Sequence, residues 1–78
     1  MMNNVIQCVN AFDAGIGNQP EENTISFYHI ARERLLETEA EREAFRWGVM
    51  AKQVGRKGDP EMESRMLKRY LAALQRLN

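Results

Sequence analysis

Several residue types and motifs are scarce or missing in this 78-residue chain, and these absences exclude several classes of protein. Cys8 is the only cysteine, so the sequence predicts neither an internal disulfide nor a zinc site built from cysteines. His29 is the only histidine, and no convincing Ser-His-Asp set can be assembled around it. The two glycines of residues 15–20 lack the Gly-Lys-Ser/Thr ending of a phosphate-binding loop.

Long apolar runs and targeting signals are also missing. No stretch approaches the roughly 20 apolar residues that a helix needs to span a bilayer. The start, Met1-Met2-Asn3-Asn4, has neither the basic residues nor the apolar run of a secretory signal. Together with the single cysteine, these absences predict a cytoplasmic protein. With 44% hydrophobic and 28% charged residues, the composition is that of one small folded domain with a thin core.

The clearest pattern present predicts an antiparallel helical hairpin over residues 38–78. Thr38 and Glu41 have the spacing of a capping box at the start of its first helix. Gly55 is predicted to end that helix at positive φ, opening a tight basic turn over residues 55–58. Asp59 followed by Pro60 is a strong signal for the start of the second helix. The predicted fold is therefore all-α, a small bundle of three to four helices built around this C-terminal hairpin.

Residues 1–22 are predicted to form an N-terminal segment, and residues 23–78 the helical domain. The spacing of Val5, Val9 and Phe12 fits a short helix that is capped by Asn3 or Asn4 and stopped by Gly15. The β-branched residues of 5–9 also fit a strand, which would have to pair with a second copy. Residues 15–20 are predicted to be a Gly/Pro loop.

The next helix is expected to begin at Asn23, Thr24 or Ser26. Its apolar face rotates across the polar run of residues 37–43. The segment 24–54 therefore reads either as one long helix or as two helices that separate at Thr38, since the capping box favours a break and the strong helix formers favour continuity.

Charge is balanced overall but divided between the halves. Residues 1–45 contain 3 basic and 8 acidic residues, a net charge of −5, and residues 46–78 contain 8 basic and 3 acidic residues, a net charge of +5. Such an asymmetry suggests either that the basic half contacts nucleic acid or that it pairs head-to-tail with an acidic surface.

Candidates for chemistry are few. His29 and Glu33 lie one helical turn apart, but a zinc site needs a third protein ligand and only Glu37 lies on that face. The acids of residues 37–43 have no apolar surroundings that would raise a carboxyl pKa, so we interpret them as a solvated face. Cys8 has no basic neighbour and is expected to be a small buried side chain. We predict no catalytic residue, no metal, no cofactor and no enzymatic activity.

The predictions concern binding surfaces. The bases around the predicted turn are expected to form a partner-binding patch: Lys52, Arg56, Lys57, Arg65, Lys68 and Arg69. A coiled-coil-like seam on the last helix is expected to form a dimer interface: Leu67, Tyr70, Leu74 and Leu77.

These surfaces predict a small interaction protein, a regulator or inhibitor of the phage type, that acts as a homodimer on a protein with an acidic surface. The alternative is a DNA-binding transcriptional regulator that uses the hairpin as a helix-turn-helix with a basic patch. A third hypothesis is a subunit or a small-molecule binder whose pocket forms between copies.

Overall fold

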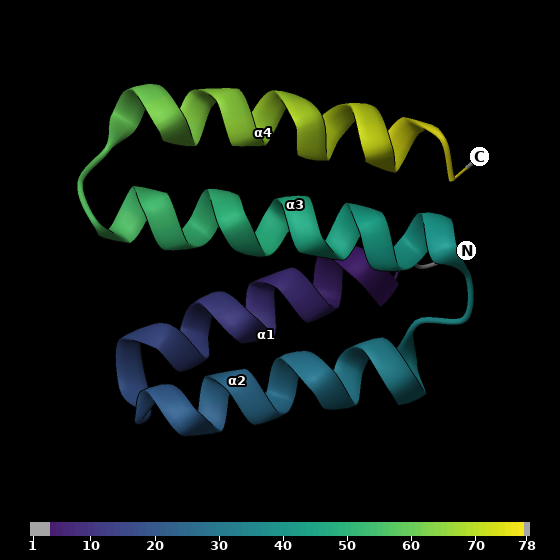
Figure 1. Cartoon of the computed structure of the whole chain (residues 1–78), viewed down its shortest axis with the longest axis horizontal. Helices are drawn as coiled ribbons and strands as arrows, with labels where there is room; N and C mark the ends of the chain where they lie inside the picture. The colour runs from purple at the N-terminus through teal and green to yellow at the C-terminus, as the bar shows by residue number, and fades with distance from the viewer. Residues whose placement is uncertain (1–3, 78) are drawn as a thin grey trace.

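The computed structural model describes residues 4–77 of the chain, and helices account for nearly all of them (Figure 1). The elements are α1 (Asn4–Asn18), α2 (Glu21–Ile30), a short π-helical turn η1 (Ala31–Leu35), α3 (Glu39–Arg56) and α4 (Pro60–Gln75). Residues 4–77 contain no strand, so residues 5–9 are helical and the all-α prediction is confirmed. Nor does any helix in this range have the length and apolar character needed to cross a membrane.

The helices form a flat assembly with α3 near its centre. Figure 1 shows α4, α3, α1 and α2 from top to bottom, and the described residues extend over 31 × 27 × 18 Å. The antiparallel hairpin of α3 and α4 is the most extensively packed pair, and α1 packs on another side of α3. This arrangement confirms the prediction of a small helical bundle.

The start of α3 is capped as predicted. The hydroxyl oxygen of Thr38 accepts a hydrogen bond from the backbone N–H of Glu41 at 3.1 Å, and the Glu41 carboxylate accepts one from the Thr38 N–H at 3.0 Å. This capping box follows the extended residue Leu36, where η1 has ended. The segment 24–54 is therefore two helices that separate before α3.

The observed turn lies within the predicted residues 55–58, but the glycine that ends α3 is three residues later than predicted. Gly55 is still helical, and the residue at positive φ is Gly58, with φ 82°. The Gly58 N–H donates to the Gly55 carbonyl and the Asp59 N–H donates to the Val54 carbonyl, both at 3.1 Å, which is the Schellman pattern. The prediction for Gly55 was wrong because Gly58, in the same short stretch, ends the helix instead.

The start of α4 confirms the prediction made from Asp59 and Pro60. The Asp59 carboxylate accepts a hydrogen bond from the backbone N–H of Met62 at 3.0 Å, and Pro60 occupies the first helical position. The missing proline N–H costs nothing there, because that donor has no partner within the helix.

α1 belongs to the same core as the hairpin. It buries Val5, Cys8, Val9 and Phe12, and Phe45 and Leu36 are the largest fully buried side chains of the core. The predicted stop at Gly15 was wrong, since α1 continues to Asn18, and the predicted loop over residues 15–20 is confined to residues 19–20. Of the two predicted caps, Asn4 lies inside the helix and Asn3 lies outside the described residues.

Tertiary contacts explain why α1 continues through its two glycines, which have low helix propensity. A Cβ at Gly15 would stand 3.3 Å from the methyl carbon of Thr24, so the missing side chain lets α2 approach. A Cβ at Gly17 would stand 3.0 Å from the guanidinium of Arg56. α2 then begins at Glu21, earlier than predicted, and the buried Thr24 hydroxyl donates to the Glu21 carbonyl at 2.7 Å.

Gly48 sets the distance between the central helix and its neighbours. A Cβ at this position would lie 2.6 Å from Cγ2 of Val9 on α1 and 2.8 Å from Cε1 of Tyr70 on α4. Real Cβ atoms are not found that close to carbon, so α1 and α4 both approach α3 where it has no side chain. The close contacts at Gly48 thereby fix the positions of α1 and α4 relative to α3.

Candidate functional site

The residues of the predicted dimer seam pack inside the monomer. Tyr70 belongs to the buried core, and the three leucines are half-buried against it: Leu67, Leu74 and Leu77. The structure therefore brings these four residues together, but toward the core of their own chain. The prediction of a homodimer remains a prediction, and this apolar stripe is already covered.

The predicted basic patch is divided among separate places. Nε of Arg56 donates to the carboxylate of Asp13 on α1 at 2.8 Å, which directs it away from the hairpin. Lys52 is half-buried on α3, and Lys57 is exposed in the turn. The remaining bases, Arg65, Lys68 and Arg69, are all exposed on α4, where Arg65 pairs with Glu61 of the same helix at 3.2 Å.

Arg76, which was not in the predicted set, continues this exposed basic face of α4. Arg65, Arg69 and Arg76 are spaced by four and seven residues, so they share one flank of the helix. From Ser64 to its end, α4 has no acidic residue. The basic residues of the second half of the chain thus lie mainly on one face of α4.

Two arginines lie against the single tryptophan. The guanidinium carbon of Arg69 is 4.9 Å from the centre of the Trp47 ring, and that of Arg46, from the same helix as Trp47, is 5.8 Å away. At these distances each cation is attracted to the electron-rich face of the ring. Trp47 and Arg69 each stand eleven residues from Gly58, so the antiparallel hairpin places them side by side.

An apolar groove adjoins this cluster between α2 and α3. Its volume is about 230 Å³, and it is lined by Phe12, Ile25, Tyr28, Arg46, Val49, Met50 and Gln53. The Tyr28 ring stacks on the buried Phe45 ring with centroids 5.1 Å apart, which holds this wall in place. Ile25 is 50% exposed, so half of this large apolar side chain remains open to solvent. None of the described residues lining the groove is acidic.

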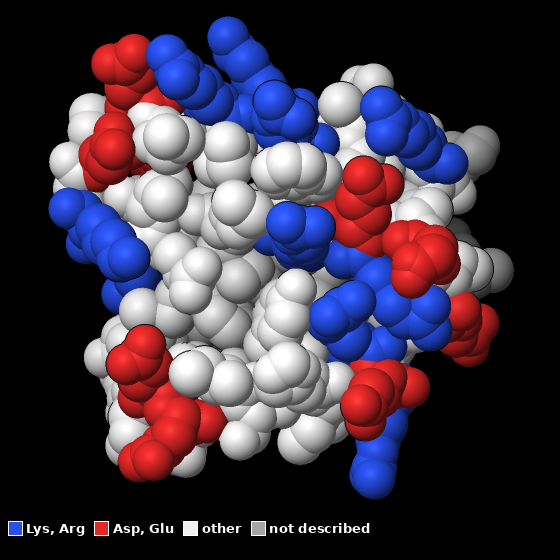
Figure 2. Space-filling view, viewed as in Figure 1, with Lys and Arg blue, Asp and Glu red and all other residues white. Residues whose placement is uncertain are grey.

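Arg46 joins the groove to the tryptophan, because it both lines the groove and lies against the ring. We call the combined surface the groove face and define it by Ile25, Tyr28, Arg46, Trp47, Met50, Gln53 and Arg69. In the view of Figure 2, basic side chains lie along the upper edge, where α4 runs, with acidic side chains at its left end, and uncharged atoms cover much of the middle. Aromatic residues, methionine and arginine are the types enriched in protein–protein interfaces.

The sequence contained part of the signal for this surface. Arg69 was in the predicted patch, and Trp47 is a large aromatic residue of the kind that serves either in a core or as an interface anchor. Arg46 and the groove were missed, because Ile25 of α2 and Met50 of α3 line one groove only when both helices pack against α1. The register of the hairpin about Gly58 would have identified the contact between Trp47 and Arg69.

A second, charged cleft of about 480 Å³ lies where η1 meets α3 and is lined by His29, Arg32, Glu33, Glu39 and Arg42. Nε of Arg42 donates to the Arg32 carbonyl at 3.0 Å, and its Nη2 donates to the Leu36 carbonyl at 3.2 Å. A cation bonded to the last carbonyls of a helix stabilises its C-terminal end. Within residues 4–77, no three His, Cys, Asp or Glu side chains are grouped to hold a metal ion. This cleft is a structural charge cluster.

Cys8 is buried as expected. Burial raises the pKa of its thiol, and the negative charge of Glu41 raises it further. A raised pKa lowers the fraction of thiolate at neutral pH, and the thiolate is the reactive form. Cys8 therefore has the environment of a core residue.

The groove face combines the features of a binding surface better than the charged cleft does. It has an open apolar groove, an adjacent tryptophan and two arginines that are exposed at its edge. Comparison with known proteins adds nothing to this, since no family model, no curated protein and no solved structure matches the chain.

Proposed function

We propose that this chain is a non-enzymatic interaction protein, a regulator or inhibitor, that binds a segment of a protein partner at the groove face. The observation that supports this proposal is the contact of Arg46 with both the groove and Trp47. An apolar groove beside exposed guanidinium groups fits a segment that has apolar residues on one side and carboxylates next to them.

An amphipathic helix of the partner matches this surface best. Such a helix places apolar side chains at intervals of three and four residues, and these enter a groove between two helices. Its acidic side chains then meet Arg46 and Arg69, whose planar guanidinium groups bind carboxylates through two parallel hydrogen bonds. The other bases of α4 increase the rate of encounter with an acidic surface.

The test compares two variants with the same change of charge. Arg46→Glu with Arg69→Glu alters the groove face, and Lys57→Glu with Lys68→Glu alters two exposed bases outside it. Both should keep the helical circular-dichroism spectrum, since exposed charges contribute about 0–1 kcal/mol each to stability.

A partner recovered from the native host with the wild-type protein should be lost with the arginine variant. It should be retained by the lysine variant, with slower association. Met50→Asp, which places a charge in the groove itself, should also abolish binding. Retention of the partner by both groove-face variants would reject the proposal.

Nucleic acid is the second candidate, favoured by the basic face of α4, which has no acidic residue after Glu63. The hairpin does not have the form of a helix-turn-helix, whose helices cross at about 90–120°. α3 and α4 instead lie side by side (Figure 1). Binding to duplex DNA would therefore rest on phosphate contacts, and its affinity must fall steeply with salt. A salt titration with arbitrary duplex DNA separates this candidate from a protein partner.

We also propose that the protein is cytoplasmic. Its one cysteine is an unpaired thiol, which suits a reducing compartment.

A further inference from the structure

Arg46 and Arg69 are held by an aromatic ring and not by carboxylates. Within residues 4–77, three other arginines form ion pairs with acidic side chains: Arg42 with Glu39, Arg56 with Asp13, and Arg65 with Glu61. In the same part of the chain neither Arg46 nor Arg69 has such a pair, and both lie against Trp47. Even Glu43, which precedes Arg46 by three residues on α3, is not paired with it. The counter-charge of these two arginines must therefore come from outside the described chain.

The ring that holds them is itself fixed in position. Trp47 is half-buried and packs against the hydrophobic core. The neighbouring residue, Gly48, is where Tyr70 of α4 comes closest to α3. Because Tyr70 directly follows Arg69, this close approach also sets the position of Arg69 beside the ring. The guanidinium groups of two different helices thus meet one tryptophan where the two backbones are held together.

Contact with a ring leaves the hydrogen-bond donors of an arginine available. A guanidinium has five N–H donors, and a carboxylate that binds it through two parallel hydrogen bonds occupies two of them. An aromatic ring instead attracts the positive charge to its electron-rich face. Within residues 4–77 the side chains of Arg46 and Arg69 donate no hydrogen bond. Since the ring also restricts their motion, they lose less conformational entropy when they bind an anion.

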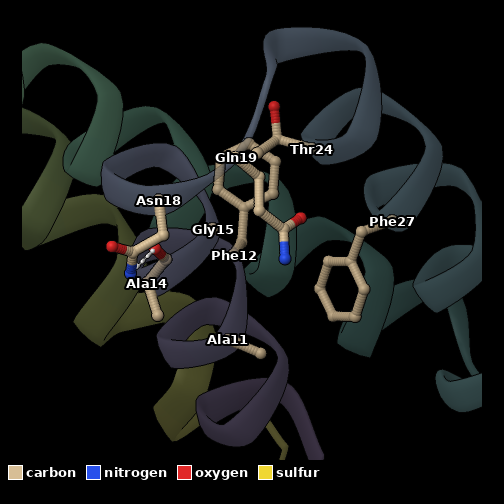
Figure 3. A pocket seen from close by; sticks show the side chains of 8 residues that line it. All are labelled: Ala11, Phe12, Ala14, Gly15, Asn18, Gln19, Thr24 and Phe27. Carbon is tan, nitrogen blue, oxygen red and sulfur yellow. Dashed lines mark hydrogen bonds between the residues drawn. The ribbon is translucent and has the colours of Figure 1, made fainter.

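A cavity between α1 and α2 lacks such groups. Its volume is about 380 Å³, and in Figure 3 the Gln19 side chain and the Phe27 ring extend into the space between the two helices. None of the described residues that line this cavity is charged. A carboxylate brought there would have no cation beside it, and an unpaired buried charge is costly. A segment with acidic side chains therefore fits the groove face and not this cavity.

We infer that Trp47 is a positioning residue, which holds Arg46 and Arg69 ready for two carboxylates of the partner. This inference rests on the proposed function and adds the spacing of the partner's acids. The two guanidinium carbons are at most 10.7 Å apart, the sum of their distances from the ring centre. On a helix, residues four and seven positions apart share a face and are separated by about 6 and about 10 Å. The partner's segment thus carries two acidic residues four or seven positions apart, beside its apolar residues.

Fluorescence quenching tests the anion site without the partner, because Trp47 is the only tryptophan of the chain. Iodide and caesium both quench indole, and each is compared with its effect on free N-acetyltryptophanamide at constant ionic strength. Two adjacent cations raise the local concentration of anions, so iodide should quench the wild type roughly twofold more than caesium. Arg46→Gln with Arg69→Gln should lose this preference. The matched control, Lys57→Gln with Lys68→Gln, should keep it.

Binding of a carboxylate probe tests the role of the ring. The probe is fluorescein-labelled hexaglutamate, followed by anisotropy, with labelled hexaglutamine as the uncharged control peptide. Trp47→Leu should weaken hexaglutamate binding about threefold or more, and Trp47→Phe, which keeps an aromatic face, should lie between it and the wild type. The salt dependence of binding should be unchanged in Trp47→Leu, because both charges remain, and should be weaker in Arg46→Gln with Arg69→Gln. Circular dichroism checks that each variant is folded.

Two results would overturn the inference. One is equal quenching of the wild type by iodide and caesium, and the other is hexaglutamate binding that Trp47→Leu leaves unchanged. Both are independent of the groove, which the effect of Met50→Asp on partner recovery tests separately. A failure of the carboxylate site is therefore distinguishable from a failure of the proposed function.

Discussion

Replacing Gly48 with alanine tests the packing on which the fold depends. The added methyl would stand 2.6 Å from a methyl carbon of Val9 and 2.8 Å and 3.0 Å from two ring carbons of Tyr70. Val9 is 1% exposed and Tyr70 8%, so neither side chain can turn into solvent. The clash must be relieved by moving α1 and α4 away from α3.

Two opposing terms decide the magnitude. Alanine is a better helix former than glycine, which favours the variant by about 1 kcal/mol. Overpacking a core costs about 1–3 kcal/mol, and here the methyl meets neighbours on two sides. We therefore expect a net destabilisation of about 1–2 kcal/mol. For a domain of this size that lowers Tm by about 4–8 °C for each kcal/mol.

The measurement is urea denaturation followed by circular dichroism, with Gly55→Ala as the matched control. Gly55 lies in the same helix, and alanine brings the same gain in propensity there. Its methyl would meet only the carboxylate of Glu63, the far end of a flexible side chain. Gly55→Ala should therefore be neutral or stabilising by up to about 1 kcal/mol. If Gly48→Ala is as stable as this control, α1 and α4 do not approach α3 as described.

Three further outcomes are expected. Gly58→Ala should destabilise the protein by about 1 kcal/mol, since φ is positive there, and an unchanged urea midpoint would mean that the turn is elsewhere. Asp59→Ala should cost about 1 kcal/mol through the lost helix cap, measured in the same way. Stability should decline as the pH rises above 9.0, the ordinary pKa of the Cys8 thiol, because burial raises the pKa values of Cys8 and Tyr70 and the unfolded chain releases those protons first. In Cys8→Ala the alkaline decline should be shallower, and an identical pH profile would show that this thiol does not contribute.

Hydrogen bonds between residues close in sequence explain which predictions were confirmed. The capping box of Thr38 and Glu41 closes over three residues, as does the cap that Asp59 makes on α4. Such contacts form whenever the chain is helical, so their residue types are visible in the sequence. The helical class of the whole chain follows from the same local preferences.

The candidate site was predictable only in part. Arg69 belongs to the predicted patch, and it lies near Trp47 because the hairpin is antiparallel about its turn. The groove was not predictable, since it exists only where α1, α2 and α3 come together. The sequence leaves two glycines, Gly55 and Gly58, as possible ends of the first helix. A turn placed at Gly55 would have given a shifted register between α3 and α4.

By itself, then, the sequence determined the helices of the hairpin, their caps and the division of charge between the halves, because each depends on residue type and on neighbours within about four positions. Only the tertiary structure decided which surfaces remain for a partner. It drew Arg56 to Asp13, 43 residues away in sequence, and turned the leucine seam of α4 toward the core. It also kept α1 helical through Gly15 and Gly17, where Thr24 and Arg56 pack close to the backbone. These choices depend on which helices meet, and contacts between distant residues outweigh the small preferences of single residues.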